Sequence, residues 1–577
     1  MISFNIVNKN ENSICNVKLA EKVGDISQYE FSCTFPEKIH PKEITVSFCM
    51  PYGDAFSIWN YSCAQNRVLL SDWRENLQKT KSRLAFGLPV HSVIAQNGDN
   101  VFTLSVSDIK NSLELSSGIN EFCAGHNCVI KFFTQLTEKI SEYKAIIRID
   151  ERKINFAQAI TECIENLREI NGLKQKKTPF EAKLPVFSTW YNFHQNINEE
   201  NLLNQCRPAS ELGMKTIIID DGWQTDNAVG GYAYCGDWKP YRGKFPNMAE
   251  FIKKVHQCGL LAMLWYSVPF VGKYSDAWKR FEGKFLDNPE NDWCCLDPRF
   301  PDVRDYLVKI YEDALKTWKL DGFKLDFIDA FMLTEYSDTQ SPERDFESLE
   351  EAVLCLLDEI EKSLKSIKPD VLIEFRQNYI GPAVTSHGNM IRVGDCAMDA
   401  LTNRIGVLDL RLYSGKAAVH SDMIMWDYTA KPYIAAKQLC AILFGVPQIS
   451  VLVDKISPEQ YKMLKYYLEF YQSHIDTLID GKLSLYNPEA GYSMADAETE
   501  KEKITVCYSK NIVELSYKPH YIVNGSGENY VVLMSEKPRN IRYEITDCMG
   551  EMIMNGENEV SGILYLEVPE SGFLKVY

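Results

Sequence analysis

Charged residues interrupt an apolar run in the stretch DGFKLDFIDA, residues 321–330, which otherwise has the pattern of a buried β-strand. Charged side chains are rarely buried unless they are paired or used in chemistry. Lys324 and Asp326 are two residues apart, so in a strand they point to the same side. A nearby ammonium group lowers the pKa of a carboxylic acid. The pattern therefore indicates either a structural salt bridge or an ionised carboxylate that acts as a nucleophile or stabilises a cation.

Four other apolar runs also end in polar or aromatic residues. These residues are Asp220 and Asp221, Trp265 and Tyr266, Glu374 and Arg376, and Arg392 and Asp395. Five strands that end in this way are hard to explain by packing alone. The repetition favours a shared functional site over an isolated salt bridge.

Two carboxyl groups are what a retaining glycosidase requires. One acts as the nucleophile, and the other, about 5–5.5 Å away, protonates the leaving oxygen and then activates water. Asp326 suits the first role and Asp395 the second, for which Asp395 would need a raised pKa. Asp399 is a rival for the second role, although its place before an expected helix also suits an N-cap.

Other residues near these strand ends suit sugar binding. The adjacent Asp220 and Asp221 could together hold vicinal hydroxyl groups. Trp265, and with less specificity Trp223 or Trp190, could stack on the apolar face of a pyranose ring. A single tryptophan is nevertheless more often part of a core.

Metal binding is the main competing chemistry for clustered carboxylates. The sequence contains no glycine-rich phosphate loop and no HxH or HExxH pattern. His420 and Asp422 flank the expected seventh strand, but one histidine is a weak signal, and a hydrogen-bonded structural histidine is favoured. We therefore expect no metal and no cofactor, and a metal-dependent lyase remains a remote alternative.

The elements that must position these residues follow a strand–helix rhythm from about residue 184. Eight short apolar runs, most of them separated by amphipathic helical patterns, predict a (β/α)8 barrel with its active site at the carboxyl ends of the strands. A helix is expected over 302–320, and another is expected to begin with Ser341 as N-cap and Pro342 in its first turn. The fifth unit has room for only a short helix at 376–389. The runs are 185–190, 216–221, 261–266, 322–327, 371–375, 390–395, 422–426 and 448–453.

Alternating segments flank this region on both sides. Before it, runs such as VFTLSVS predict an antiparallel β-sandwich, followed by a helix at 155–170 and a polar linker. After about residue 480 the strands return and predict a small antiparallel β-sandwich. The expected domains are residues 1–175, 184–480 and 481–577, so the fold class is an α/β barrel with two flanking β-domains.

The amino-acid composition argues against some classes of binding partner. The 577 residues carry a formal net charge of −17, which argues against nucleic acid or an anionic membrane, since either requires a basic surface. No apolar run reaches the length of a membrane helix, and no secretion signal is recognised, so a cytoplasmic location is expected. The 17 cysteines lack metal-ligand spacing and are expected to be free thiols. The oligomeric state is not predicted.

The order of these motifs resembles a known family. The segments TIIIDDGWQ, GDWKPYRGKFPNM, LLAMLWYSVPF, LDGFKLDFIDAF and IRVGDC resemble the motif series of the α-galactosidases of glycoside hydrolase family 36. The resemblance covers about residues 185–455, and the flanking β-domains fit the three-domain plan of that family. It implies hydrolysis of α-linked terminal galactose with retention of configuration and without a metal.

The resemblance also implies roles for individual residues. Asp326 matches the nucleophile and Asp395 the acid/base. Asp220 and Asp221 match residues that contact the galactose 4- and 6-hydroxyls, and Trp265 matches part of the pocket. Lys324 and Arg392 would hold hydroxyls and orient the carboxylates. The N-terminal domain would lend an aromatic residue, for which Trp59 and Trp73 are the candidates.

The sequence departs from the family pattern after the fifth strand. Many members have a stretch rich in Cys, Ser and Gly there, near the sugar 2-position, whereas this chain has EFRQNYIGP. Arg376 and Glu374 would fill that subsite, which leaves the glycone open. The expected function is a retaining hydrolase of α-galactosides, with an oligosaccharide or glycoside as substrate. The alternatives are another α-glycone such as N-acetylgalactosamine, galactosyl transfer to a sugar acceptor, and a sugar-binding protein without catalysis.

Overall fold

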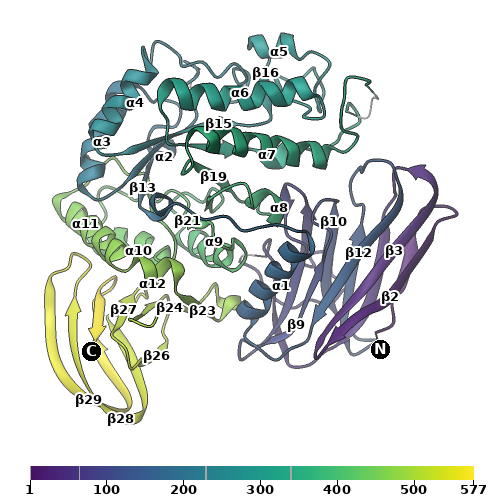
Figure 1. The fold of residues 1–577 in the computed structure, drawn as a ribbon. Helices are drawn as coiled ribbons and strands as arrows, with labels where there is room; N and C mark the ends of the chain where they lie inside the picture. Colours follow the sequence, from purple (N-terminus) through teal and green to yellow (C-terminus); the bar gives the residue numbers. More distant parts are fainter. Residues whose placement is uncertain (1, 64, 228–229, 338–340) are drawn as a thin grey trace.

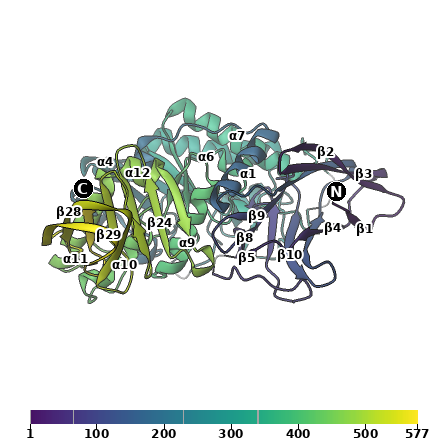
Figure 2. The same ribbon diagram turned by 90° about the horizontal axis from the view of Figure 1, so that it is seen from below.

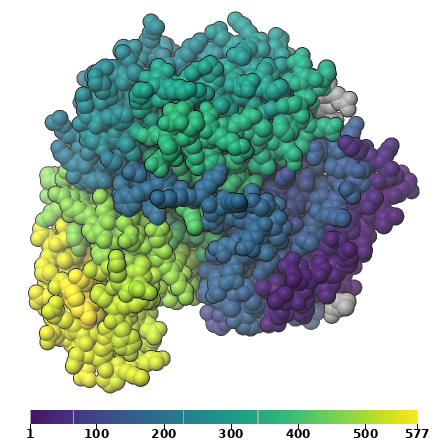
Figure 3. Space-filling view, in the orientation of Figure 1, coloured from purple at the N-terminus to yellow at the C-terminus, as the bar shows by residue number. Residues whose placement is uncertain are grey.

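The computed structural model describes residues 2–63, 65–227, 230–337 and 341–577. Two β-domains flank a central barrel with a helical layer (Figure 1). Viewed from below, the N-terminal and C-terminal domains lie at opposite ends of the molecule (Figure 2). The space-filling view shows both of them packed against the same barrel (Figure 3). The α/β-barrel architecture predicted from the sequence is confirmed.

The N-terminal domain is a sandwich of two antiparallel six-stranded sheets, with strand orders β1-β4-β11-β10-β6-β7 and β2-β3-β12-β9-β8-β5. Alternate residues of its long strands are apolar and buried, as Tyr29, Phe31 and Cys33 are in β3. Helix α1 (Phe156–Ile170) covers β8 and β9 and begins at the predicted place. The strands are β1 (Asn5–Asn8), β2 (Ile14–Val23), β3 (Ile26–Ile39), β4 (Ile44–Pro51), β5 (Ala55–Trp59), β6 (Lys79–Arg83), β7 (Phe86–Gly87), β8 (Val90–Ala95), β9 (Asn100–Val106), β10 (Leu113–Asn120), β11 (Gly125–Phe132) and β12 (Ile140–Asp150).

One disulfide corrects the expectation that all cysteines are free thiols. Cys49 in β4 is bonded to Cys123 in the turn between β10 and β11, while the other fifteen cysteines are free. Strands β4 and β11 are neighbours in the sheet, and Cys49 lies opposite Asn127. The sheet topology therefore brings together two cysteines that are 74 residues apart in sequence, a proximity that their spacing did not reveal.

Eight parallel strands form the nearly closed barrel, in the order β21-β20-β19-β18-β15-β14-β13-β22. Isolated bridges from His420 to Val446 and from Ile424 to Ile449 link the segments around the first and last strands of this order. The strands are β13 (Val186–Ser188), β14 (Thr216–Ile219), β15 (Leu261–Ser267), β18 (Gly322–Asp326), β19 (Leu372–Arg376), β20 (Met390–Arg392), β21 (Ala418–His420) and β22 (Gln448–Ile449).

Helices follow most of these strands and form the outer layer (Figure 1). The predicted short fifth helix is confirmed as α8. No helix in the described part of the chain is long and apolar enough to cross a membrane. The helices are α2 (Trp190–Phe193), α3 (Glu199–Glu211), α4 (Met248–Gln257), α5 (Asp276–Arg280), α6 (Pro301–Trp318), α7 (Leu349–Ile367), α8 (Pro382–Thr385), α9 (Ala400–Tyr413), α10 (Pro432–Ala441), α11 (Pro458–Ser473) and α12 (Ile475–Asp480).

Two element predictions within the barrel are wrong. The seventh strand is Ala418–His420, whereas the apolar run 422–426 is a buried segment that follows it. Periodicity cannot separate a short buried strand from a buried loop. Helix α7 begins at Leu349 rather than after Ser341, and Ser348 caps it by accepting a hydrogen bond from the Glu351 N–H. The apolar stripe begins only at Leu349, so the helix has no face to bury before that residue.

The C-terminal domain is one eight-stranded sheet. Its strands are ordered β23-β24-β25-β27-β30-β28-β26, with β29 paired to β28. An antiparallel sandwich was expected, whereas the strands are hydrogen-bonded into a single sheet. Most pairs are antiparallel, but β25–β27 and β26–β28 are parallel. The strands are β23 (Lys482–Tyr486), β24 (Met494–Glu498), β25 (Lys503–Cys507), β26 (Ile512–Glu514), β27 (His520–Asn524), β28 (Tyr530–Thr546), β29 (Met552–Glu567) and β30 (Phe573–Val576).

The N-terminal domain holds two loops at the mouth of the barrel. Arg83 donates hydrogen bonds to the carbonyl oxygens of Asp329 and Phe331, in the loop after β18. The backbone N–H of Gly87 donates to the carbonyl oxygen of Asn378, at 2.8 Å, in the loop after β19. The flanking domain therefore fixes backbone within a few residues of the charged strand ends.

Asp409 of α9 joins all three domains. Its carboxylate accepts two hydrogen bonds from Arg67, at 2.6 and 2.9 Å, and one from the Trp59 indole at 3.0 Å. The Tyr492 hydroxyl, from the C-terminal domain, donates to the same carboxylate. The side chains of Arg67 and Asp409 are 1% and 3% exposed, so neither charge can be solvated if its partner is removed.

We expect Asp409→Ala to lower the free energy of unfolding by about 3–5 kcal/mol, because it leaves the Arg67 cation buried without a counter-ion. Urea denaturation followed by tryptophan fluorescence measures this. Asp313→Ala is the control: Asp313 pairs with Lys309 on the surface of α6, and its loss should change stability by at most about 1 kcal/mol. Equal losses in the two variants would contradict the role assigned to Asp409.

Candidate functional site

The carboxyl ends of the barrel strands bring the predicted site residues together. Parallel pairing aligns Lys324 with Glu374 and with Trp265 on the neighbouring strands. One step further along, Arg376 is aligned with Arg392. Since all strands run in the same direction, their ends meet at one mouth, where the active sites of such barrels lie.

Asp326, the last residue of β18, is held by several donors. Its Oδ1 accepts from Arg376 Nε at 2.7 Å, from the Phe327 N–H at 2.8 Å and from the Tyr379 hydroxyl at 3.2 Å. Its Oδ2 accepts from the Trp265 indole at 2.9 Å. The residue is 5% exposed. Tyr379 is a contact that sequence reasoning missed, because no pattern marks it.

The surroundings of Asp326 keep it ionised. Burial by itself would raise its pKa, but the charges of Arg376 and Lys324 outweigh burial and hold the pKa at about 2. An ionised carboxylate with fixed geometry is what nucleophilic attack on a sugar carbon requires.

Lys324 makes its short contact with a different acid from the one expected. Its ammonium group donates to Asp220 at 2.6 Å, and both side chains are buried. The salt bridge considered between Lys324 and Asp326 is therefore not a direct hydrogen bond, although Lys324 still acts on the pKa of Asp326.

Asp221 has neutral partners. The side-chain amides of Gln195 and Gln224 donate to it at 2.6 and 2.7 Å. Burial raises its pKa to about 6 although these donors favour the charged form. Neither glutamine was singled out from the sequence.

Asp395 is more open to solvent than Asp326. Its side chain is 58% exposed and accepts a hydrogen bond from Arg392 at 2.9 Å. A raised pKa was expected for it, but the direction is the opposite: partial burial favours a higher pKa, while Arg392 and Lys324 together lower it below its usual value. The physical reason is the guanidinium group of Arg392, which was expected near Asp395 but whose effect on the pKa of Asp395 was not considered.

Asp399, the rival candidate, is the N-cap of α9. Its Oδ1 accepts from the Thr402 N–H at 3.0 Å, and its Oδ2 accepts from the Thr402 hydroxyl at 2.6 Å. The N-cap interpretation of Asp399 is confirmed.

A further acid, Asp422, lies beside Asp395. It follows β21, is fully buried, and accepts hydrogen bonds from Arg392, from the Tyr191 hydroxyl at 2.7 Å and from the Cys396 N–H at 2.6 Å. On sequence grounds a structural role was favoured for His420, and Asp422 was not proposed as a site residue. Asp422 could have been found, because it is a charged residue at the edge of an apolar run.

Glu374 lies in the barrel interior beneath these groups and is fully buried. It accepts a hydrogen bond from Gln448, whose amide also contacts His420. Burial raises the pKa of Glu374 to about 7, although Lys324 and Arg392 act in the other direction. His420 donates to the Ala182 carbonyl at 2.8 Å, which supports the structural role expected for it.

The tryptophans considered as sugar-binding residues lie in different surroundings. Trp265 contacts Asp326, whereas Trp223 is a core residue whose indole donates to the Trp265 carbonyl. Trp59 is buried and donates to Asp409, so it is not available to a ligand. Trp73 is 66% exposed, and the guanidinium of Arg74 lies over its ring. Trp190 packs on His194.

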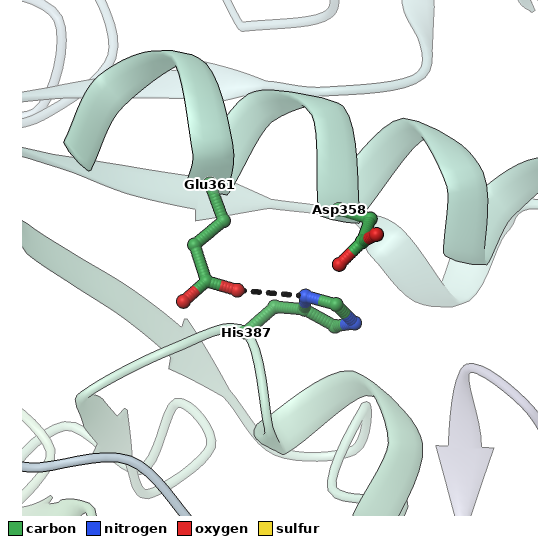
Figure 4. A group of neighbouring side chains, drawn as sticks. All are labelled: Asp358, Glu361 and His387. Atoms are coloured by element: carbon green, nitrogen blue, oxygen red, sulfur yellow. Dashed lines mark hydrogen bonds and ion pairs between the residues drawn. The ribbon is translucent and has the colours of Figure 1, made fainter. Parts of the chain in front are cut away.

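Within the described residues, one group of possible metal ligands comes from α7 and the segment after α8, and none of its members is among the mouth residues described above (Figure 4). Asp358 and Glu361 of α7 approach His387, and their ligand atoms lie within 4.8 Å of one another. Glu361 also accepts hydrogen bonds from Lys176 and Lys365. Because ammonium groups already occupy its oxygens, the group is an ion-pair network rather than a cation site.

Comparisons with known proteins show which family this chain resembles. A family model described as Melibiase matches residues 166–386. The chain is 25% identical over 297 residues to the α-galactosidase Mel36A of Lactobacillus acidophilus, and 26% identical over 205 residues to the α-galactosidase AgaA of Geobacillus stearothermophilus. The match to Mel36A covers 49% of this chain and 37% of that relative. The match to AgaA covers 33% of this chain and 26% of that relative. The matched part of this chain is thus well under two thirds of the length of these relatives.

Solved structures show the same fold over nearly the whole chain. A variant of AgaA in complex with 1-deoxygalactonojirimycin matches with a TM-score of 0.64 and 16% identity, covering 96% of this chain and 80% of that one. The α-galactosidase TtGalA of Thermus thermophilus matches with a TM-score of 0.56 and 15% identity, covering 83% and 97%. Together these matches confirm the resemblance that the motif series indicated, to the α-galactosidases of glycoside hydrolase family 36.

Proposed function

We propose that the protein is a retaining glycoside hydrolase that releases terminal α-linked galactose from oligosaccharides. The observation that carries this proposal is the contrast between Asp326, buried and held ionised, and Asp395, exposed at the same mouth. The similarity to α-galactosidases supports the choice of sugar, and a variant of AgaA has been solved in complex with raffinose.

In the proposed reaction, Asp326 attacks the anomeric carbon while protonated Asp395 gives its proton to the departing oxygen. A covalent β-galactosyl-enzyme forms, and Asp395 is left as a carboxylate. It then takes a proton from water, whose oxygen attacks the anomeric carbon and displaces Asp326. The two inversions give α-galactose, and both carboxyl groups return to their starting states.

The remaining residues of the mouth suit sugar binding in this proposal. Asp220 and Asp221 accept hydrogen bonds from hydroxyls, and Lys324 donates one while it stays paired with Asp220. Trp265 borders the nucleophile, where its ring can pack against the pyranose.

A different α-glycone is the second candidate, and one observation favours it. Arg376, in the segment that departs from the family pattern, donates to Asp326 and has its guanidinium over the Phe327 ring at 5.1 Å. This places a large cation beside the nucleophile. The mechanism would be the same, with the glycone or the acceptor sugar changed.

We expect purified enzyme to hydrolyse nitrophenyl α-galactoside in the presence of EDTA, and Asp326→Ala to lose about 10⁴-fold or more of this activity. A panel of nitrophenyl α-glycosides measures both the activity and the specificity. Asp399→Asn, which keeps a side chain suited to capping, is the control and should retain activity.

The outcomes of this panel separate the candidates. Turnover of another α-glycoside, also abolished in Asp326→Ala, would support the mechanism and the second candidate sugar. Failure to hydrolyse any glycoside of the panel would refute a metal-independent hydrolase. So would an activity that is present without EDTA and lost when EDTA is added.

Glu374 makes the stability of the folded protein depend on pH. Its pKa of about 7 lies above the usual value of 4.5, so the folded state holds its proton more tightly than the unfolded state does. Its contribution to stability is therefore fully present below pH 4.5 and is lost as the pH rises through about 7. A glutamine at this position would keep the neutral form at every pH.

We expect Glu374→Gln to gain stability relative to wild type as the pH rises from about 4.5 to about 7.5. Urea denaturation at several pH values measures the difference between the two proteins. Glu500→Gln, at an exposed position, is the control and should show a constant difference. A constant difference for Glu374→Gln as well would show that Glu374 does not carry a raised pKa.

A further inference from the structure

Arg392 is a buried cation shared between acids. The residue is 1% exposed, and its guanidinium donates to Asp395 at 2.9 Å and to Asp422. Its Nε lies 3.9 Å from Glu374 Oε1. A cation at this depth requires an ionic partner, since an unpaired buried charge is costly.

The two main partners of Arg392 differ in how firmly they are held. Asp422 is 0% exposed, and its carboxylate also accepts from Tyr191 and from the backbone of Cys396. Its backbone N–H and carbonyl both bond to the side chain of Asn403, at 2.9 and 3.1 Å. The side chain of Asp395, in contrast, is 58% exposed and accepts its hydrogen bond from Arg392.

The proposed reaction requires Asp395 to alternate between a neutral acid and a carboxylate. When Asp395 holds its proton, it no longer balances the charge of Arg392. Glu374 is a poor substitute, because it is farther from the guanidinium and hydrogen-bonds to Gln448. Asp422 is therefore the buried acid that stays beside Arg392 in both states of Asp395. Burial raises its pKa, while Arg392, Tyr191 and the Cys396 N–H favour its charged form.

We propose that Asp422 is a positioning residue that keeps Arg392 paired while Asp395 gains and loses its proton. The contact with Cys396, next in sequence to Asp395, also lets Asp422 fix the loop that carries the acid/base. This inference rests on the proposed function and deepens it, since it names the group that lets Asp395 act as an acid despite a neighbouring guanidinium.

The charge of Asp422 should set the pH at which Asp395 loses its proton. Without that charge Arg392 would pair with Asp395 alone, which stabilises the carboxylate and lowers its pKa. Charged and titratable groups from several elements face the two acids Asp395 and Asp422 or the Arg392 between them. They are Lys324 and Asp326 of β18, Glu374 and Arg376 of β19, Arg392 of β20, Tyr191 of α2 and Cys396 of the following loop.

The first test is the pH profile of kcat/KM for an α-galactoside with an alkyl leaving group. We expect the alkaline limb, which reports loss of the proton from Asp395, to move about one unit to lower pH in Asp422→Asn. Asp399→Asn removes a nearby acid outside this network and should leave the limb in place. An unmoved limb in Asp422→Asn would overturn the inference.

The second test uses the leaving group, because a dinitrophenyl group departs with little need of an acid. At neutral pH we expect Asp422→Asn to lose about tenfold or more on the alkyl galactoside but less than about threefold on the dinitrophenyl galactoside. A merely structural role predicts equal losses on both substrates, and that result would overturn the inference.

Tyr191→Phe keeps the test decisive if Asp422→Asn does not fold. This variant removes a donor that favours the charged form of Asp422, so the pKa of Asp422 rises and its charge beside Arg392 weakens. The alkaline limb should therefore move to lower pH, and an unmoved limb would overturn the inference. A wild type inactive on every glycoside would refute the proposed function itself, whereas an active wild type with an unmoved limb in Asp422→Asn would refute the role of Asp422 alone.

Discussion

The structure of the barrel mouth depends on one constraint: a cation buried away from water must lie against an anion. Lys324 meets this requirement with Asp220, and Arg376 meets it with Asp326. Arg392 meets it with Asp422, and also with Asp395. Because each pair joins residues from different strands or from the loops that follow them, the ionic contacts fix the relative positions of the strand ends as well as their charges.

This pairing gives the two central carboxylates different properties. Asp326 lies deep among donors and stays ionised, whereas Asp395 lies at the exposed rim and has Arg392 as its close cation. The same chemical group is therefore held in two environments, one buried and one exposed, although neighbouring cations lower the pKa of both. The N-terminal domain contributes by bonding to the loops after β18 and β19, and Asp409 ties that domain to the barrel and to the C-terminal domain.

Local pattern predicted much of this architecture. Seven of the eight apolar runs coincide with barrel strands, and the helices at 156–170 and 301–318 lie where their periodicity placed them. The two incorrect element predictions also arose from local sequence patterns. The run 422–426 is apolar because it is buried, not because it is a strand, and Ser341 with Pro342 imitates a helix start that has no apolar stripe behind it. Composition and spacing do not distinguish these cases, since burial is decided by distant parts of the chain.

The sequence by itself determined which residue types end the strands, because side-chain alternation and the parallel arrangement of a barrel place Asp326, Asp395, Lys324 and Arg392 at one mouth. Only the tertiary structure decided which of these groups pair with one another. The partner of Lys324 is 104 residues away, that of Asp409 is 342 residues away, and the link between Cys49 and Cys123 spans 74. The pKa of Asp395 likewise follows from the guanidinium beside it. Pair interactions fall off over a few ångströms in space, and separation along the chain does not report that distance.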